Sequence, residues 1–173
     1  MSQNEKQTRQ DARSIADTQV EMTQVVLPVF ANTLGTVFGG QIMSWIDICA
    51  AVSAQRHSRS VVVTASIDGV HFIEPIKQGY IVVLKSQVNA VFRTSMEIGV
   101  AVIAEAPLTG ERRRAARAYC TFVALDQKGH PIEVPELIVT SEEDQRRQRD
   151  AVERRRIRLL HRKLEVKHAH QVE

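Results

Sequence analysis

Residues 32–56 read NTLGTVFGGQIMSWIDICAAVSAQR and predict the central element of the fold. The segment begins with small, turn-forming residues and passes through Gly39-Gly40 into a pattern that is apolar on almost every side of a helical wheel. Because a helix that is apolar all round is normally buried, the rest of the domain should wrap around this one. The segment is too short and too interrupted to span a bilayer, so we expect no membrane insertion.

One narrow stripe of this predicted helix is polar. Gln41, Ser44 and Asp47 follow one another at three-residue spacing and therefore share one side of the helix. An isolated carboxylate among apolar residues is costly unless it faces a polar cleft or a partner. We therefore predict that this stripe lines an active site.

The sequence around the helix predicts strands. A first strand lies within residues 20–30 and is ended by Pro28, and alternating patterns follow in residues 60–72, 79–92, 96–104 and 114–125. In the second strand the alternation places Val61, Val63, Ala65 and Ile67 on one face, and Thr64, Ser66 and Asp68 on the other. The phase changes at Gly69, which predicts a bulge or sharp bend there.

These elements predict an α+β hotdog fold, in which a curved antiparallel sheet wraps around one long buried helix. We assign residues 1–18 to a flexible lead-in, residues 19–138 to the folded domain, and residues 139–173 to a charged C-terminal helix and tail. Thr140 is the expected N-cap of that helix and Glu143 completes a capping box. A single sheet layer leaves an edge strand and the far side of the helix poorly covered, which predicts at least a dimer.

Composition and charge exclude several classes of protein. The chain has 173 residues, of which 43% are hydrophobic and 25% charged, as expected for one globular domain. Its net charge of +3 comes entirely from residue 141 onward, where ten Lys and Arg accompany seven Asp and Glu. The neutral body argues against nucleic-acid binding, and the charged tail is typical of a solvated helix face. Only Cys49 and Cys120 occur, both in apolar patterns, which predicts no disulfide, no metal site and a cytoplasmic setting.

The assembled motifs resemble the acyl-CoA thioesterase family, in its YciA-like and cytosolic long-chain acyl-CoA hydrolase branch. The most specific motif is ANTLGTVFGGQIM at residues 31–43, followed by Asp47. FIEP at residues 72–75, FRTSME at 92–97 and CTFVALD at 120–126 support it. The resemblance covers about residues 20–137, so the role of the C-terminal helix is not implied by it.

The resemblance implies hydrolysis of acyl-CoA thioesters to free fatty acid and coenzyme A. Asp47 matches the helix carboxylate that drives hydrolysis, and Asn32 matches the loop amide that holds the attacking water or the carbonyl. Gly39 and Gly40 match the helix N-terminal turn whose backbone N–H groups polarise the thioester oxygen. Because coenzyme A is part of the substrate, no cofactor and no metal ion are implied.

The resemblance also implies how the substrate and the subunits are arranged. Arg93, Thr94 and Ser95 resemble the loop that meets the nucleotide phosphates, and Gln41 and Ser44 share the predicted substrate-facing stripe. The family binds coenzyme A at a subunit interface and commonly assembles as a trimer of dimers. We therefore expect a homo-oligomer, a dimer at minimum and a hexamer by family resemblance.

Elementary chemistry supports this interpretation and adds a constraint. Unblocked N–H donors at a helix N-terminus stabilise a developing oxyanion and typically contribute ~10²–10³ in rate. Gly39 and Asp47 are eight residues apart, which corresponds to ~12 Å along a helix axis. Because this distance is too long for the Gly39 N–H and the Asp47 carboxylate of one helix to act on the same carbonyl group, we predict a composite site. One subunit then provides the N–H donors and another provides the carboxylate.

Several alternatives stay open at this stage. Asp47 is compatible with general-base catalysis, with nucleophilic attack that forms a mixed anhydride, and with a purely structural carboxylate at an interface. Gly39 and Gly40 are also compatible with a role in close helix packing. Asn32 is compatible with a turn residue and Arg93 with an exposed hairpin residue. A sensor that binds acyl-CoA without turnover and a hotdog dehydratase are competing functions, although dehydratases use a histidine and none lies near residues 32–47.

Overall fold

The computed structural model describes residues 12–169, with side chains through residue 162. The chain forms two compact units, Met1–Ile138 and Val139–Glu173, and each is described by itself. Part of the predicted lead-in has regular structure, because Arg13–Ser14 forms strand β1 and Ile15–Thr18 forms the short helix α2. The remainder of that lead-in, residues 1–11, lies outside the described residues.

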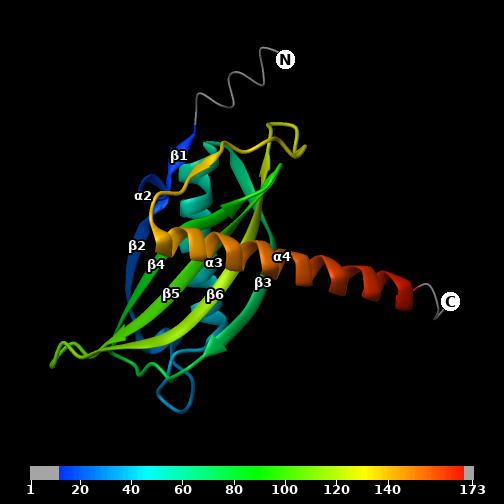
Figure 1. The fold of residues 1–173 in the computed structure, drawn as a ribbon. Coiled ribbons are helices and arrows are strands. Elements are labelled where there is room, and N and C mark those ends of the chain that lie inside the picture. Colours follow the sequence, from blue (N-terminus) through cyan, green and yellow to red (C-terminus); the bar gives the residue numbers. More distant parts are fainter. Residues whose placement is uncertain (1–11, 170–173) are drawn as a thin grey trace, which may run out of the picture. The chain divides into compact units, whose positions relative to one another are not determined.

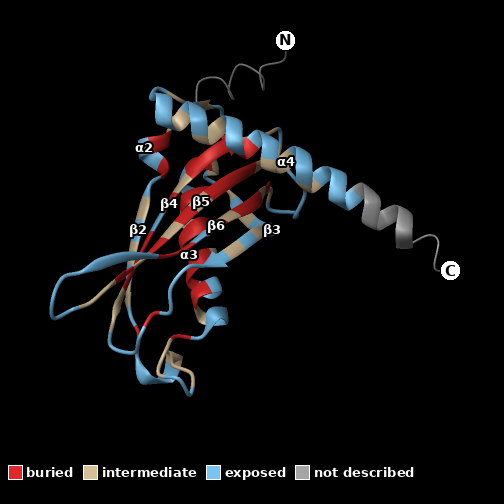
Figure 2. Cartoon of the chain, turned by 60° about the horizontal axis from the view of Figure 1, so that its bottom comes forward, coloured by how far each residue is buried: buried red, intermediate tan, exposed pale blue. Residues whose placement is uncertain are grey.

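The first unit is built around helix α3, which spans Gly39–Ser58 as the sequence predicts. Arg59 ends the helix in a left-handed conformation (φ 53°), and its N–H donates to the Gln55 carbonyl. On one side of α3 the largest buried side chains are Ile42, Trp45 and Ile46. Figure 2 shows this pattern, with buried residues along α3 and in the middle of the strands, and exposed residues in the loops.

A five-stranded antiparallel sheet curves around α3 (Figure 1). Its strand order is β2-β4-β5-β6-β3, with β2 at Val20–Val25, β3 at Val61–Phe72, β4 at Ile81–Val91, β5 at Ser95–Glu105 and β6 at Arg112–Leu125. Leu84, Ile98 and Phe122, from the three middle strands, are buried in the same hydrophobic core as the α3 side chains. The predicted α+β architecture is therefore confirmed. Strand β2 ends at Val25, before the end predicted at Pro28, and Pro28–Phe30 forms a 3₁₀ helix, η1.

The predicted faces of β3 are wrong for the residues before Ala65. The register with β6 shifts between Thr64 and Ser66, so Ala65 forms a bulge that the sequence pattern did not reveal. Val62 and Ile67 pack against the core, whereas Val63 is 43% exposed. A one-residue slip turns every preceding side chain to the other face, which is why Thr64 lies on the side of α3. The bulge predicted at Gly69 is confirmed by a second register shift, between Asp68 and His71.

Helix α3 is buried on one side only, contrary to the prediction that the domain covers it all round. Met43 is 41% and Ile48 50% exposed, and both lie on the same side of the helix as Ser44 and Asp47. The single sheet cannot reach this side, since it wraps around the opposite one. Next to it, β3 is an edge strand on which Val61 is also exposed. The predicted uncovered edge and helix side are therefore both present in one copy of the chain.

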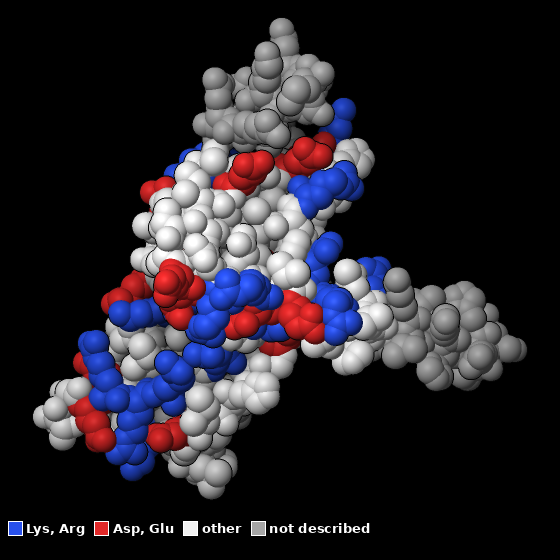
Figure 3. Space-filling view, viewed as in Figure 1, with Lys and Arg blue, Asp and Glu red and all other residues white. Residues whose placement is uncertain are grey.

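The second unit consists of helix α4, Glu142–Ala169. Ser141, and not the expected Thr140, caps this helix, because the Asp144 N–H donates to Ser141 Oγ (3.1 Å) and Ser141 Oγ donates to Asp144 Oδ2 (2.6 Å). Glu143 instead pairs with Arg146 and Arg147, and these hydrogen bonds lower its pKa to about 2. Figure 3 shows acidic and basic side chains interspersed along this helix. No helix among the described residues is long and apolar enough to cross a membrane.

Candidate active site

The first turn of α3 presents backbone donors that no part of the described chain uses. Phe38 precedes the helix without a side-chain cap, and its carbonyl accepts the N–H groups of Gln41 and Ile42. Neither the Gly39 nor the Gly40 N–H donates a hydrogen bond to a described residue. These two N–H groups lie at the positive end of the helix dipole, where an anion or a developing oxyanion is stabilised.

The two glycines of this turn have different surroundings. A Cβ atom at Gly39 would stand 3.3 Å from the Phe72 ring, whereas nothing lies within 4 Å of a Cβ at Gly40. Close packing therefore accounts for Gly39 but not for Gly40. The open space beside Gly40 leaves room for a ligand to approach the backbone.

Asn32 organises the loop that leads into α3. Its Oδ1 accepts hydrogen bonds from the Leu34 and Thr36 N–H groups (2.9 and 3.2 Å), and its Nδ2 donates to Thr36 Oγ1 (3.0 Å). This arrangement is an Asx-type turn, in which the side chain replaces a backbone turn contact. In one copy of the chain, the half-buried Asn32 side chain thus holds the loop together and does not meet Asp47.

Asp47 is held by a residue that the sequence patterns did not single out. Thr64 Oγ1 donates a hydrogen bond of 2.6 Å to Asp47 Oδ1. The Asp47 carboxylate is half-buried and forms no salt bridge with any described residue, so it is neither sealed in the core nor paired with a described basic side chain. Thr64 was missed because the alternation of residues 60–72 put it on the face away from the helix. The only signal for Thr64 in the sequence was a polar side chain within the strand that follows the helix of Asp47.

Gln41 and Ser44, the other members of the predicted polar stripe, lie on the helix between the glycine turn and Asp47. Gln41 is half-buried and Ser44 is exposed. Gly39 and Asp47 belong to the same continuous helix, so their separation of ~12 Å along the axis is retained. A single copy therefore does not bring the donor turn and the carboxylate to one carbonyl group.

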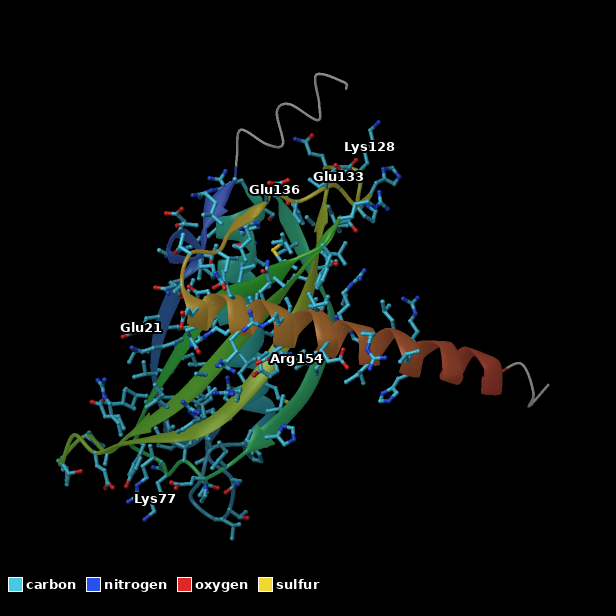
Figure 4. The ribbon with its side chains drawn as sticks, in the orientation of Figure 1. Glu21, Lys77, Lys128, Glu133, Glu136 and Arg154 are labelled. Carbon is cyan, nitrogen blue, oxygen red and sulfur yellow. The ribbon has the colours of Figure 1, made fainter. Side chains whose placement is uncertain are left out.

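Arg93, Thr94 and Ser95 lie at the other end of the sheet from the donor turn. The Arg93 carbonyl accepts the Val134 N–H, whereas Thr36, in the loop before α3, pairs with Lys77 just before β4. Between these points run the 11 residues of β4, or roughly 36 Å of strand. Figure 4 shows Lys77 and Glu133 at opposite ends of the first unit. The predicted phosphate loop and the donor turn are therefore far apart within one chain.

The other reactive side chains of the described residues do not form a second active site. Burial, followed by the charge of Asp47, raises the pKa of Cys120 to about 12, and burial also raises the pKa of Cys49. Neither thiol is therefore ionised near neutral pH, as a nucleophile would need to be. His71 is exposed and contacts the Gly69 carbonyl through Nδ1 (3.0 Å). No group of three potential metal ligands occurs among the described residues.

Known proteins of similar sequence are thioesterases or thioester hydrolases by name. The sequence pattern of the thioesterase superfamily matches residues 34–111. An uncharacterized acyl-CoA thioester hydrolase of Bacillus subtilis, YkhA, is 44% identical over 144 residues, which cover 83% of this chain and 84% of that protein. The acyl-coenzyme A thioesterase 11 of Mus musculus is 37% identical over 144 residues, 83% of this chain, but this match spans only 24% of the longer mouse protein.

Several solved structures have the same fold as this protein over most of its chain. An acyl-CoA hydrolase from Bacillus cereus has a TM-score of 0.86 and 39% identity, covering 94% of this chain and 98% of the other. A hexameric acyl-CoA thioesterase in its apo form has a TM-score of 0.84 and 37% identity, covering 87% and 97%. An acyl-CoA hydrolase from Staphylococcus aureus, in complex with butyryl-coenzyme A, coenzyme A and coenzyme A disulfide, has a TM-score of 0.83 and 33% identity, covering 91% and 98%.

Three further structures of the Staphylococcus aureus enzyme carry single alanine replacements, of one aspartate, one asparagine and one threonine. Each covers at least 91% of this chain at 32% identity. Sequence and fold thus agree over most of the domain that surrounds α3. The chain belongs to the thioesterase superfamily and has the hotdog fold of that family.

Proposed function

We propose that this protein hydrolyses acyl-CoA thioesters to free fatty acid and coenzyme A. The observation that carries the proposal is the Asp47 carboxylate, which Thr64 holds on the uncovered side of α3, together with the Gly39 and Gly40 N–H groups, which donate to no described residue. This combination offers a base or nucleophile together with donors for an oxyanion, the two groups that thioester hydrolysis requires.

The Staphylococcus aureus variants support the choice of residues. The asparagine, aspartate and threonine replaced there are separated by fifteen and seventeen positions. Asn32, Asp47 and Thr64 have the same two separations in this chain. The three replaced residues of that enzyme therefore correspond, by spacing and residue type, to the loop amide, the helix carboxylate and its hydrogen-bond donor.

In the proposed reaction, the N–H groups of Gly39 and Gly40 stabilise the negative charge that develops on the thioester oxygen. In one route, Asp47 removes a proton from an attacking water, and the tetrahedral adduct breaks its C–S bond to release coenzyme A as a thiolate, which takes up that proton, together with the free fatty acid. In the other, the Asp47 carboxylate attacks the carbonyl carbon and expels the coenzyme A thiolate, which takes a proton from solvent, and water then hydrolyses the resulting mixed anhydride to the fatty acid and the free carboxylate. Single-turnover hydrolysis in ¹⁸O-labelled water tests for the anhydride route. Label appears in the Asp47 carboxylate only after turnover through the anhydride.

The site is composite, with the donor turn of one copy facing the Asp47 of another. Three features support this arrangement: the distance along α3, the uncovered helix side with Met43 and Ile48, and the exposed edge of β3 with Val61 and Val63. Pairing of two such edges covers all of these residues. The similar hexameric thioesterase supports a homo-oligomer of this kind, with a dimer as its smallest unit.

Coenzyme A enters this scheme as part of the substrate, and the reaction needs no further cofactor. Arg93, with Thr94 and Ser95 beside it, holds the nucleotide phosphates of a thioester bound at the donor turn of another copy. The exposure of Arg93 and its distance from the donor turn of its own chain support this assignment. The buried, unpaired Cys49 and Cys120 support a reducing, cytoplasmic setting.

Release of free thiol from a panel of acyl-CoA substrates tests the function. Wild-type protein should release coenzyme A with multiple turnovers, and the Glu21→Gln variant, which changes an exposed carboxylate on strand β2, should retain this activity. Binding of acyl-CoA without thiol release would favour a sensor. Hydration of an enoyl thioester without thiol release would favour a dehydratase.

A further inference from the structure

The aromatic ring of Phe72 packs against the first residue of α3. Phe72 is the last residue of β3, and its Cζ lies 3.3 Å from the position that a Cβ atom would take at Gly39. The gap between ring and helix is therefore too narrow for a methyl group to fit without displacing the ring. On the neighbouring side, nothing lies within 4 Å of a Cβ at Gly40.

This ring is not a core side chain. Phe72 is 53% exposed, and Phe38, which precedes the helix, and Ile73, which follows Phe72 in the chain, are 51% and 56% exposed. A half-exposed ring that also contacts Gly39 is accessible to a ligand bound at the first turn of α3. The surface around these donors is closed on the Gly39 side and open on the Gly40 side.

If the Gly39 and Gly40 N–H groups bind the thioester oxygen, the closed Gly39 side and the open Gly40 side restrict the shape of the acyl group. An oxygen that accepts these N–H groups lies ~2.7–3.1 Å from the donor nitrogens, so the carbon atoms next to its carbonyl lie beside the ring. Because Phe72, Ile73 and Phe38 are all apolar, the hydrocarbon side of the thioester suits this surface better than the polar amides of the coenzyme A arm. A straight chain leaves along the open side, whereas a branch at the first carbon meets the ring.

We propose that Phe72 is a specificity-determining residue that selects acyl groups unbranched next to the thioester carbonyl. This inference rests on the proposed hydrolysis and specifies which acyl groups the enzyme accepts. Butyryl-CoA and isobutyryl-CoA provide the matched pair of substrates, since they have the same number of carbon atoms and differ only in branching. Wild-type protein hydrolyses butyryl-CoA with the higher kcat/KM.

The test compares this kcat/KM ratio in wild-type protein, Phe72→Ala and Phe72→Tyr. Removal of the ring lowers the preference for butyryl-CoA about tenfold, within the roughly 10–200-fold that a methylene-sized difference contributes in an apolar pocket. Phe72→Tyr keeps the ring and retains the ratio. If Phe72→Ala does not fold, Phe72→Val carries the same comparison with a smaller loss of volume.

The outcomes separate this inference from the proposed function. Equal loss of activity toward both substrates, with the ratio unchanged, assigns Phe72 a purely structural role and overturns the inference while leaving hydrolysis intact. A wild-type enzyme that prefers isobutyryl-CoA also overturns it. Absence of thiol release from every acyl-CoA removes the proposed function, and this inference with it.

Discussion

Thr64 and Asp47 are joined by a hydrogen bond of 2.6 Å that links the edge strand β3 to the central helix α3. The contact fixes one carboxylate oxygen of Asp47 and leaves the other directed away from Thr64. It depends on the bulge at Ala65, because an unbroken alternation of β3 would turn the Thr64 hydroxyl to the opposite face of the sheet. The geometry of the proposed base is therefore set by a local irregularity in a neighbouring strand.

Replacement of Asp47 by alanine should lower turnover at least ~100-fold, the lower end of the usual contribution of a positioned acid or base. The assembly should stay intact, since Asp47 forms no salt bridge with a described residue and its Thr64 partner is exposed. Thiol-release kinetics and light scattering on the same sample measure the two quantities. Dissociation of the oligomer in Asp47→Ala would instead identify an architectural carboxylate.

Loss of the Thr64 hydroxyl should reduce turnover less than loss of Asp47. A hydrogen bond of this kind typically contributes ~1 kcal/mol, which corresponds to a decrease in kcat of roughly fivefold to tenfold for Thr64→Val. Thr64→Ser keeps the donor and serves as the matched control. An unchanged kcat in Thr64→Val would show that the carboxylate does not need this contact.

A lysine on the edge of β3 should separate the subunits. Val63 is 43% exposed on an edge strand, and a charge there opposes pairing with a second edge. Val63→Lys should reduce the mass measured by light scattering and lower activity together with it, because the proposed site takes residues from two copies. Leu108→Lys, in a turn residue that is 98% exposed, is the control and should change neither quantity.

The stability of the first unit should fall at mildly acidic pH because of His57. Its ring is buried, Nε2 contacts the Pro135 carbonyl at 2.9 Å and Nδ1 has no partner among the described residues. Burial lowers the pKa of His57, so the unfolded chain binds its proton more readily than the folded one. The folded state is thus fully favoured above the unfolded value of ~6.5 and loses stability as the pH drops below it.

Denaturant unfolding at several pH values between 7.5 and 5 measures this effect, with an upper limit of about 1.4 kcal/mol per pH unit for one group. His57→Gln carries no titrating ring and should show a shallower dependence over the same range. An identical slope in both proteins would assign the acid sensitivity to other groups.

Much of the fold follows from local patterns. The apolar run of residues 42–52 and the Gly39-Gly40 turn predict the position of α3, and alternation with short turns predicts four strands after it. Gly69 predicts its own bulge, because glycine adopts the positive φ of 32° found there. Asp47 can also be singled out from the sequence, because a charged side chain within an apolar helix needs polar surroundings.

Other features depend on contacts between residues far apart in the chain. Ala65 resembles any other strand residue, yet its bulge reverses the faces of β3 and brings Thr64 to Asp47. The packing of Phe72 on Gly39 joins the end of a strand to the start of a helix, and no spacing rule predicts such a pair. Periodicity is a property of one segment, so the sequence alone determined which segments are helix or strand and which acid stands out. Strand register and the meeting of separate segments arise only when the sheet closes around α3, and they decided which side chains surround that acid.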